Sequence, residues 1–415
     1  MKWLSLSALV AMSFSLLDDH ASAGDWPQIL GLHRSGIAAA DEQLAEKWPK
    51  SGPPVAWDHP VGAGYAGVAV AGEQVLLFHR VRQEEVVESL SVANGESEWN
   101  SSYPTTFYPQ VGGGDGPLCV PTIVGDRVVT YGAQGVLTCL NLKTGEIHWQ
   151  RKTHEEFKAQ EGYFGAGSSP IVVGERVIVN VGGSRTDAGI VAFSLETGET
   201  QWTKTQEPAS YSAPTAVELA GQPHVLMVTR YRCLMLDPES GAIRFQFPFG
   251  QRGPTVNGAT PITLDGHLLV SSSYGIGSIF AKFSLLGTET VWDGVEPLAT
   301  QYCTPIHHQG YVYVIDGRDD VPPADLKCID LETGKTTWVE YGFGYGTLIL
   351  ADGKLLAAKT NGELVMFSAN PQEFEPLSHF RVFRKTVRAL PAVSNGKLYL
   401  RDEETLKCLD LRLGL

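Results

Sequence analysis

Short apolar runs alternate with turn residues along the whole chain, and many of these units begin at a proline. "PTIVGDRVVTYG" (121–132) and "PITLDGHLLVSS" (261–272) each hold two apolar runs around a Gly-Asp or Asp-Gly pair. Alternation with period two around such a pair is typical of two antiparallel strands joined by a tight turn. The proline recurs 44–49 residues apart, with a final gap of 86 residues, at Pro121, Pro170, Pro214, Pro261, Pro305 and Pro391. The spacing predicts a structural repeat.

A second pattern completes each repeat. "LNLKTGEIHW" (140–149), "FSLETGETQW" (193–202) and "IDLETGKTTW" (329–338) each read as a third strand, a Thr-Gly turn and a fourth strand that carries a tryptophan. Because the aromatic residue recurs, we interpret it as a packing residue between neighbouring repeats rather than as part of a ligand-binding surface. The predicted docking residues are Trp57, Trp99, Trp149, Trp202, Phe245, Trp292 and Trp338.

Counting these units predicts an all-β fold. Segment 66–79 opens the first unit and 347–367 is a unit without its tryptophan, which brings the total to eight four-stranded units. Repeats of this length with four strands are typical of β-propeller blades. The last unit lacks a fourth strand, whereas "PPVAWDHPV" (53–61) is a fourth strand without the preceding three. We therefore predict a single eight-bladed β-propeller over 24–415, built of antiparallel blades and closed by N- and C-terminal strands.

The six cysteines follow the same repeat. Four of them fall in third strands and two lie two residues before a repeat proline. Equivalent positions in different blades are too far apart for a disulfide, which needs a Cα separation of about 4.4–6.8 Å. We expect six free, buried thiols that act as small apolar packing residues.

The N-terminus predicts export. Lys2, the apolar run 4–17 and the small residues Ala21 and Ala23 form the pattern of a cleavable signal peptide over residues 1–23. The run is too short to span a bilayer, and no cysteine for lipid attachment lies near the cleavage site. We expect a periplasmic or secreted monomer with no membrane span or lipid anchor. The formal charge of −14 argues against a nucleic-acid partner.

The motif "CLNLKTGEIHW" resembles the tryptophan-docking motif of pyrroloquinoline-quinone-type (PQQ-like) propeller repeats, and "DWPQILGLHRSGI" (25–37) is similar to the opening of exported bacterial members. The resemblance implies a BamB-like propeller. In the quinoprotein dehydrogenases of this superfamily, it also implies adjacent cysteines and a calcium site. This chain has no Cys-Cys pair and no recognisable calcium ligands. We expect no cofactor, and PQQ with calcium only under the dehydrogenase alternative.

No motif predicts catalysis or metal binding. His307 and His308 are consecutive on a predicted strand and would face opposite ways, so they do not predict a metal site. No G-x-S-x-G or H-E-x-x-H motif is present, and the Gly-rich segments 111–116 and 342–346 do not open a helix. We assign no catalytic residue.

Long, irregular loops predict the functional face. Loops between second and third strands and loops between blades must emerge on one face, and rigid scaffolds often bind through such loops. Residues near the strand starts would line the channel mouth: Tyr65, Asp115, Tyr163, Tyr211, Asn257, Tyr302, Tyr345 and Arg388. Charged loop residues that would meet a partner are Arg185, Asp187, Arg318, Asp319 and Asp320. Ordinary aromatics packing the channel, and solvated loop charges, are the alternatives.

These features favour an exported, non-catalytic binding or scaffold protein that holds a protein, peptide or saccharide partner on its loop-rich face. The alternative is an enzyme at the channel mouth, such as a PQQ-dependent dehydrogenase.

Overall fold

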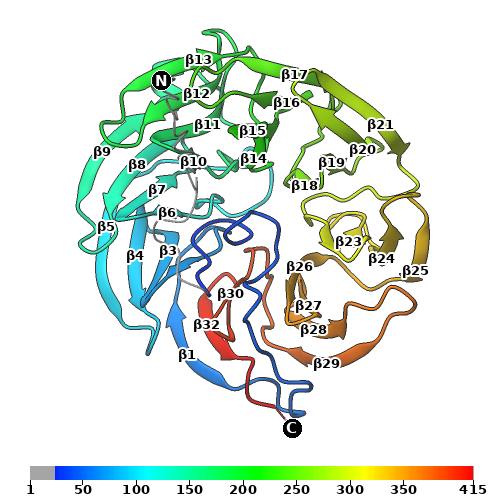
Figure 1. Cartoon of the computed structure of the whole chain (residues 1–415). Coiled ribbons are helices and arrows are strands. Elements are labelled where there is room, and N and C mark those ends of the chain that lie inside the picture. The colour runs from blue at the N-terminus through cyan, green and yellow to red at the C-terminus, as the bar shows by residue number, and fades with distance from the viewer. Residues whose placement is uncertain (1–23, 415) are drawn as a thin grey trace, which may run out of the picture.

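Eight four-stranded antiparallel sheets are arranged around a central axis, which confirms the predicted eight-bladed β-propeller (Figure 1). This computed structural model describes residues 24–414, so the predicted signal peptide (1–23) lies outside the described residues. No helix in that described range is long and apolar enough to cross a bilayer.

The first four blades follow one another along the chain, each built from the inner to the outer strand. Blade 1 contains β2 (Ala69–Ala71), β3 (Gln74–Val81), β4 (Glu84–Ser91) and β5 (Ser97–Pro104). Blade 2 contains β6 (Thr122–Val124), β7 (Arg127–Tyr131), β8 (Val136–Asn141) and β9 (Ile147–Lys152). Blade 3 contains β10 (Ile171–Val173), β11 (Arg176–Gly183), β12 (Ala188–Ser194) and β13 (Thr200–Lys204). Blade 4 contains β14 (Thr215–Leu219), β15 (Gln222–Val228), β16 (Arg232–Leu236) and β17 (Ile243–Pro248).

The remaining blades repeat this order. Blade 5 contains β18 (Ile262–Leu264), β19 (His267–Ser272), β20 (Gly277–Ser284) and β21 (Gly287–Gly294). Blade 6 contains β22 (Ile306–His308), β23 (Tyr311–Asp316), β24 (Asp325–Asp330) and β25 (Thr336–Glu340). Blade 7 contains β26 (Gly346–Ala351), β27 (Lys354–Lys359), β28 (Glu363–Ser368) and β29 (Pro376–Arg381). Blade 8 contains β30 (Ala392–Ser394), β31 (Lys397–Arg401), β32 (Thr405–Asp410) and β1 (Val55–Pro60).

Blade 8 closes the ring with strands from both ends of the described chain. β1 pairs antiparallel with β32, and Trp57 stands opposite Cys408 in that pair. The outer strand of blade 8 is therefore supplied from the N-terminal side, as the isolated strand at 53–61 predicted.

Local turn chemistry explains the hairpins between first and second strands. In five blades both central turn residues have positive φ, in the pairs Ala220-Gly221, Asp265-Gly266, Gln309-Gly310, Asp352-Gly353 and Asn395-Gly396. Two consecutive positive φ values define the type I′ turn, whose twist matches that of the flanking strands. The face that carries these hairpins is called the turn face below, and the opposite one the loop face.

The repeated tryptophans lie between neighbouring blades. Trp57 of blade 8 donates its indole N–H to the Val92 carbonyl of blade 1 at 3.0 Å, and its ring covers Gly95. A Cβ at Gly95 would lie 2.5 Å from this ring, and the φ of +72° also requires glycine there. The same bond to a carbonyl of the next blade is made by Trp99, Trp149, Trp202, Trp292 and Trp338. Phe245 instead packs edge-on against Phe283 of blade 5.

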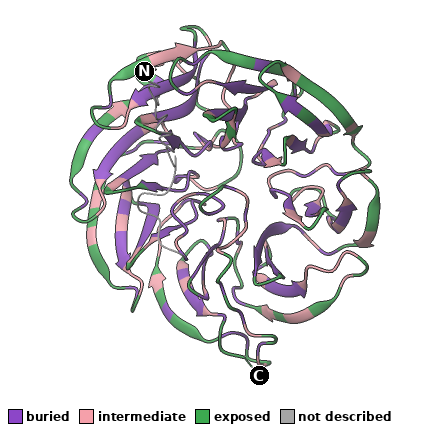
Figure 2. Cartoon of the chain, in the orientation of Figure 1, coloured by how far each residue is buried: buried purple, intermediate pink, exposed green. Residues whose placement is uncertain are grey.

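The inner and middle strands form the core, while the outer strands are largely exposed (Figure 2). All six cysteines are free and buried, which confirms the prediction of apolar packing thiols. Inner strands are also linked around the axis by hydroxyl-to-carbonyl bonds, such as Thr122 to Pro170, Ser168 to Ser212 and Thr215 to Pro261, at 2.8–3.0 Å.

Residues 24–54 form an N-terminal strap that no pattern in the sequence predicted. The strap crosses the centre of the ring (dark blue in Figure 1) and lies on the turn face. Gly72 of the first hairpin donates to Asp25 at 2.9 Å, Trp26 forms a β-bridge with Val70, and Ile37 forms one with Leu350. Glu42 accepts the Asn395 N–H at 2.7 Å. These contacts reach blades 1, 7 and 8, so the strap covers the end of the channel on that face.

The loop after β9 contains a short helix, α1 (Thr153–Phe157), where the sequence analysis expected irregular loop. Thr153 donates its hydroxyl to the Gly135 carbonyl at 2.8 Å, and the His154 ring packs over the same glycine. Glu155 and Glu156 lie in the first turn, where negative charge favours a helix.

Candidate functional site on the loop face

The loop face gathers the long irregular segments that the sequence pointed out. Antiparallel order places every turn between second and third strands on the same face as every blade-to-blade linker. Neighbouring loops also bond to each other. Gln134, from a turn in blade 2, accepts the Thr106 N–H of the preceding linker at 2.9 Å, and Thr300 forms a bridge with Gly317.

Four arginines along this face each lie over a tyrosine ring of another loop, and these four contacts are called the mouth pairs here. In each pair the guanidinium carbon lies 4.3–5.8 Å from the centre of a tyrosine ring, within the range of a cation–π contact. The pairs are Arg80–Tyr108 at 5.6 Å, Arg230–Tyr163 at 5.8 Å, Arg318–Tyr274 at 4.3 Å and Arg388–Tyr65 at 5.5 Å. Tyr65, Tyr163, Arg318 and Arg388 were named from the sequence, whereas Arg80, Tyr108, Arg230 and Tyr274 were missed.

The pair Arg388–Tyr65 joins blades 6, 8 and 1. Arg388 donates its Nε–H to Asp319 at 2.9 Å, and the Tyr65 hydroxyl donates to Glu403 at 3.1 Å. The structure thus brings together three of the named residues, Tyr65, Asp319 and Arg388, from loops distant in sequence.

Tyr302 and Tyr345 lie beside this group, and the Tyr345 side chain holds backbone. Their rings meet edge-on with centres 4.7 Å apart. The Tyr345 hydroxyl accepts the N–H groups of Tyr302 and Cys303 at 2.7 and 3.0 Å. Tyr345 is only 5% exposed, so it packs the channel wall rather than offering a contact surface.

A second group surrounds Arg318. Arg318 pairs with Asp320, and Gln301 donates to both Asp320 and the Tyr274 hydroxyl, at 3.2 and 2.8 Å. The Asp319 N–H donates to the Gln301 side chain at 2.9 Å, which links this group to the Arg388 pair.

A third group lies over blades 3 and 4. Tyr211 accepts the Phe164 N–H at 3.0 Å and packs against the Phe164 ring at 5.7 Å. Burial raises the pKa of Tyr211 to about 12, although the positive charge of Arg230 opposes that rise. Tyr163 lies next to Phe164 and under Arg230.

The other named residues have separate places. Asn257 is 2% exposed and donates to the Thr229 carbonyl at 2.8 Å, so it braces a turn. Asp115 lies 3.3 Å from the Arg80 guanidinium. Arg185 and Asp187 are exposed at the tip of blade 3, where Asp187 accepts from Gln206 at 2.7 Å.

Exposed apolar side chains lie on the loop face as well as on the turn face. Tyr108 and Tyr341 are 74% and 80% exposed. Other large apolar residues exposed in loops or strand ends on this face are Val81, Val111, Val295 and Val321. The turn face has an exposed Leu285-Leu286 hairpin tip, where Leu286 is 97% exposed.

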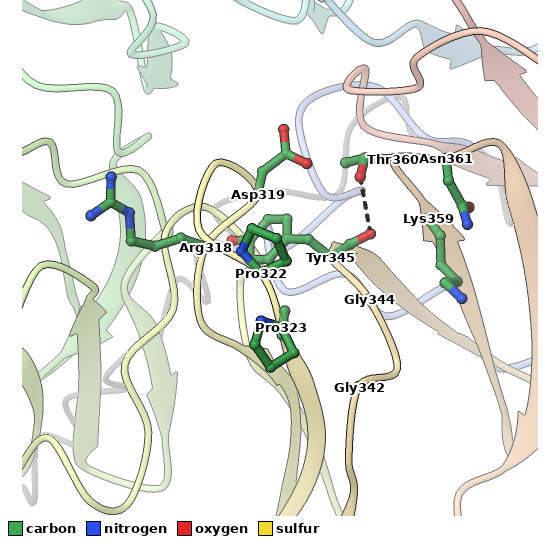
Figure 3. Close-up of a pocket in the computed structure, with 11 residues that line it drawn as sticks. Arg318, Asp319, Pro322, Pro323, Gly342, Gly344, Tyr345, Lys359, Thr360 and Asn361 are labelled. Carbon is green, nitrogen blue, oxygen red and sulfur yellow. Dashed lines mark hydrogen bonds between the residues drawn. The ribbon is translucent and has the colours of Figure 1, made fainter.

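A cavity of about 270 Å³ opens between blades 6 and 7 on the loop face (Figure 3). Figure 3 shows Arg318 and Lys359 on opposite sides of it, with Asp319, Tyr345 and Thr360 between them. Both cations are already paired, Arg318 with Asp320 and Lys359 with Glu363. The cavity is smaller than the usual pocket of roughly 300–1,000 Å³ that encloses a drug-sized ligand.

At the turn face the strap inserts Arg34 among the inner strands. Its guanidinium donates to Gln28, Ser169, Pro214 and Thr122 at 2.8, 3.3, 3.0 and 3.4 Å, and also to the Pro170 carbonyl. Arg34 is 2% exposed, and burial lowers its pKa to about 9. A second cavity, of about 380 Å³, lies beside it against β14, β18 and His307.

The side chains of the mouth do not fit a calcium-bound quinone. Calcium takes six to eight oxygen ligands, but Asp115, Asp319 and Asp320 each face an arginine. Among residues 24–414, no three His, Cys, Asp or Glu side chains are grouped to hold a metal ion. The sequence also lacks a Cys-Cys pair.

Comparison with known proteins agrees with the fold. The chain is similar to BamB from Moraxella catarrhalis, with a TM-score of 0.60 and 16% identity over 85% of this chain and 99% of that chain. It is also similar to a quinohemoprotein alcohol dehydrogenase from Comamonas testosteroni, with a TM-score of 0.69 and 14% identity over 95% and 82% of the two chains. A europium-containing methanol dehydrogenase gives a TM-score of 0.67 and 11% identity over 91% and 89%.

At these identities the similarity concerns the fold alone. No curated protein sequence matches the chain. A family model described as "Outer membrane protein assembly factor BamB" matches residues 83–340, more than half of the chain. The protein therefore belongs to the BamB-like family of PQQ-type β-propellers.

Proposed function

We propose that the chain is an exported, non-catalytic binding protein that holds a protein or peptide partner against its loop face. One observation carries the proposal: the four mouth pairs and six exposed apolar side chains share this face. Tyrosine and arginine are enriched among residues that dominate protein interfaces, and exposed apolar groups mark such surfaces. The strap covers the other end of the channel, which supports the loop face as the binding side.

Site-specific photocrosslinking tests this proposal. A photoreactive side chain is placed at Tyr108 and at Tyr341 on the loop face, and at Leu286 on the turn face as a matched exposed control. The protein is irradiated in cells that express it naturally. We expect the same discrete adducts from both loop-face positions and none from Leu286. Adducts formed equally from both faces, or only from Leu286, would reject the loop face as the binding surface.

Export is part of the proposal and has its own test. Cell fractionation followed by N-terminal sequencing of the mature protein is expected to find Gly24 as the first residue. A cytoplasmic protein that retains residues 1–23 would contradict it.

A further inference from the structure

Arg230 differs from the other three arginines of the mouth pairs. Arg80, Arg318 and Arg388 each face a carboxylate of this chain. Among the described residues no carboxylate oxygen lies within ion-pair distance of Arg230; its guanidinium donates to the Gly253 carbonyl at 2.6 Å. Its charge is therefore not matched by a negative charge from its own fold.

Two tyrosine rings lie close to this guanidinium. The centres of the Tyr163 and Tyr231 rings each lie 5.8 Å from its central carbon. Ring faces attract a cation but leave the edge of the guanidinium free to donate hydrogen bonds. Arg230 is half-buried, so an approaching group can still reach it.

Two tyrosine hydroxyls on which the charge of Arg230 acts have donor capacity left. Tyr211 accepts from the Phe164 N–H, and Tyr274 accepts from the Gln301 amide. A phenol can accept and also donate, and in both cases the hydroxyl proton remains unassigned. Burial raises the pKa of both phenols, while the charge of Arg230 opposes the rise, so both stay protonated at neutral pH. The three groups come from linkers and turns of blades 3 to 5, and each can donate a hydrogen bond.

We infer that Arg230, with Tyr211 and Tyr274, receives a carboxylate of the bound partner, either an Asp or Glu side chain or a chain terminus. The inference rests on the proposed function, since it names the group that the loop face recognises. A planar guanidinium pairs with a carboxylate through two parallel hydrogen bonds, which gives direction as well as attraction. The other mouth arginines already pair with carboxylates of this chain, so they would position loops. Arg230 would bind the carboxylate of the partner.

The test uses the mature chain on an array of peptides synthesised in matched sets. Each set differs at one position, which carries Glu, Gln, phosphoserine or Ser, and a further set compares free and amidated C-termini. We expect the protein to bind acid-containing peptides about tenfold to a hundredfold more tightly than their amide partners, as a charged hydrogen bond implies. Arg230→Gln should abolish that preference, and Arg230→Lys should restore only part of it.

Arg252→Gln is the matched control, because Arg252 is an exposed arginine of the neighbouring linker and its loss changes the net charge equally. It should keep the preference for acid. Equal binding of acid and amide peptides by the wild type, or an unchanged preference in Arg230→Gln with a native melting temperature, would overturn the inference alone. A stronger preference for phosphoserine would overturn the carboxylate assignment. Failure of the wild type to bind any peptide would overturn this inference, whereas the proposed function is judged separately by the crosslinks from Tyr108 and Tyr341.

Discussion

Removal of the Arg34 guanidinium tests whether the strap stabilises the ring. In Arg34→Met the apolar stem keeps its volume, but the carbonyls of Ser169 and Pro214 lose their donor. The Pro170 carbonyl still accepts from Thr122 at 3.0 Å. An orphaned buried acceptor costs about 1–3 kcal/mol, so two cost roughly 2–6 kcal/mol. Relief from burying an unpaired charge offsets part of this, since burial already lowers the pKa of Arg34. We expect a net loss of roughly 2–4 kcal/mol.

Urea unfolding measures this loss, and hydrogen exchange of residues 24–54 locates it. The strap should exchange faster in Arg34→Met, whereas blade interfaces such as that of Trp149 should stay protected. Arg244→Met, which removes an arginine from an exposed outer strand, serves as the control and should change stability by less than about 0.5 kcal/mol. If Arg34→Met unfolds within about 1 kcal/mol of the wild type and its strap exchanges normally, the strap does not depend on this residue.

Three further predictions concern stability and reactivity. Trp57→Ala should cost roughly 3–5 kcal/mol in urea unfolding and speed exchange in β1, because the indole bond to Val92 and the ring-closing contact disappear; a loss below about 1 kcal/mol would contradict this role. Burial lowers the pKa of His79 and of His154 to about 4, below the ordinary 6.5, so each takes up a proton more readily in the unfolded chain. Their contribution, about 3 kcal/mol each, is therefore complete above pH 6.5 and lost as the pH falls toward 4. His79→Gln should flatten that decline in melting temperature, and an unchanged profile would count against it. The six buried cysteines should resist a thiol reagent in the native protein and all react in urea, whereas fast native labelling would contradict their burial.

Much of the fold could be predicted because the repeats share the same turn residues and the same pattern of apolar strand positions. A Thr-Gly turn followed by a Trp occurs three times, and a proline before an apolar strand occurs six times. Each is weak evidence once and strong evidence when it recurs at a regular spacing. Trp57 shows this best, since its isolated strand predicted ring closure over more than 340 residues of intervening chain.

The candidate site was predicted less completely. Tyr65, Tyr163 and Arg388 could be found because they lie at a repeat position next to the inner strands. Arg80 and Arg230 were missed because they stand at the ends of second strands, where an arginine reads as an ordinary exposed residue. Tyr302 and Tyr345 were also named for the mouth. Tyr345 is buried and its hydroxyl accepts the Tyr302 N–H, so it braces backbone, whereas Tyr302 is half-buried.

The sequence by itself determined the blade count, the way the ring closes and the role of the cysteines, because these depend on spacing and on local turn geometry. Only the tertiary structure decided which charges remain free. Whether Arg230 or Arg318 pairs with a carboxylate depends on contacts between loops of different blades. The spacing of residues in the sequence does not predict these contacts. The same holds for Arg34, whose acceptors other than Gln28 lie 88 to 180 residues away and come together only when the ring forms.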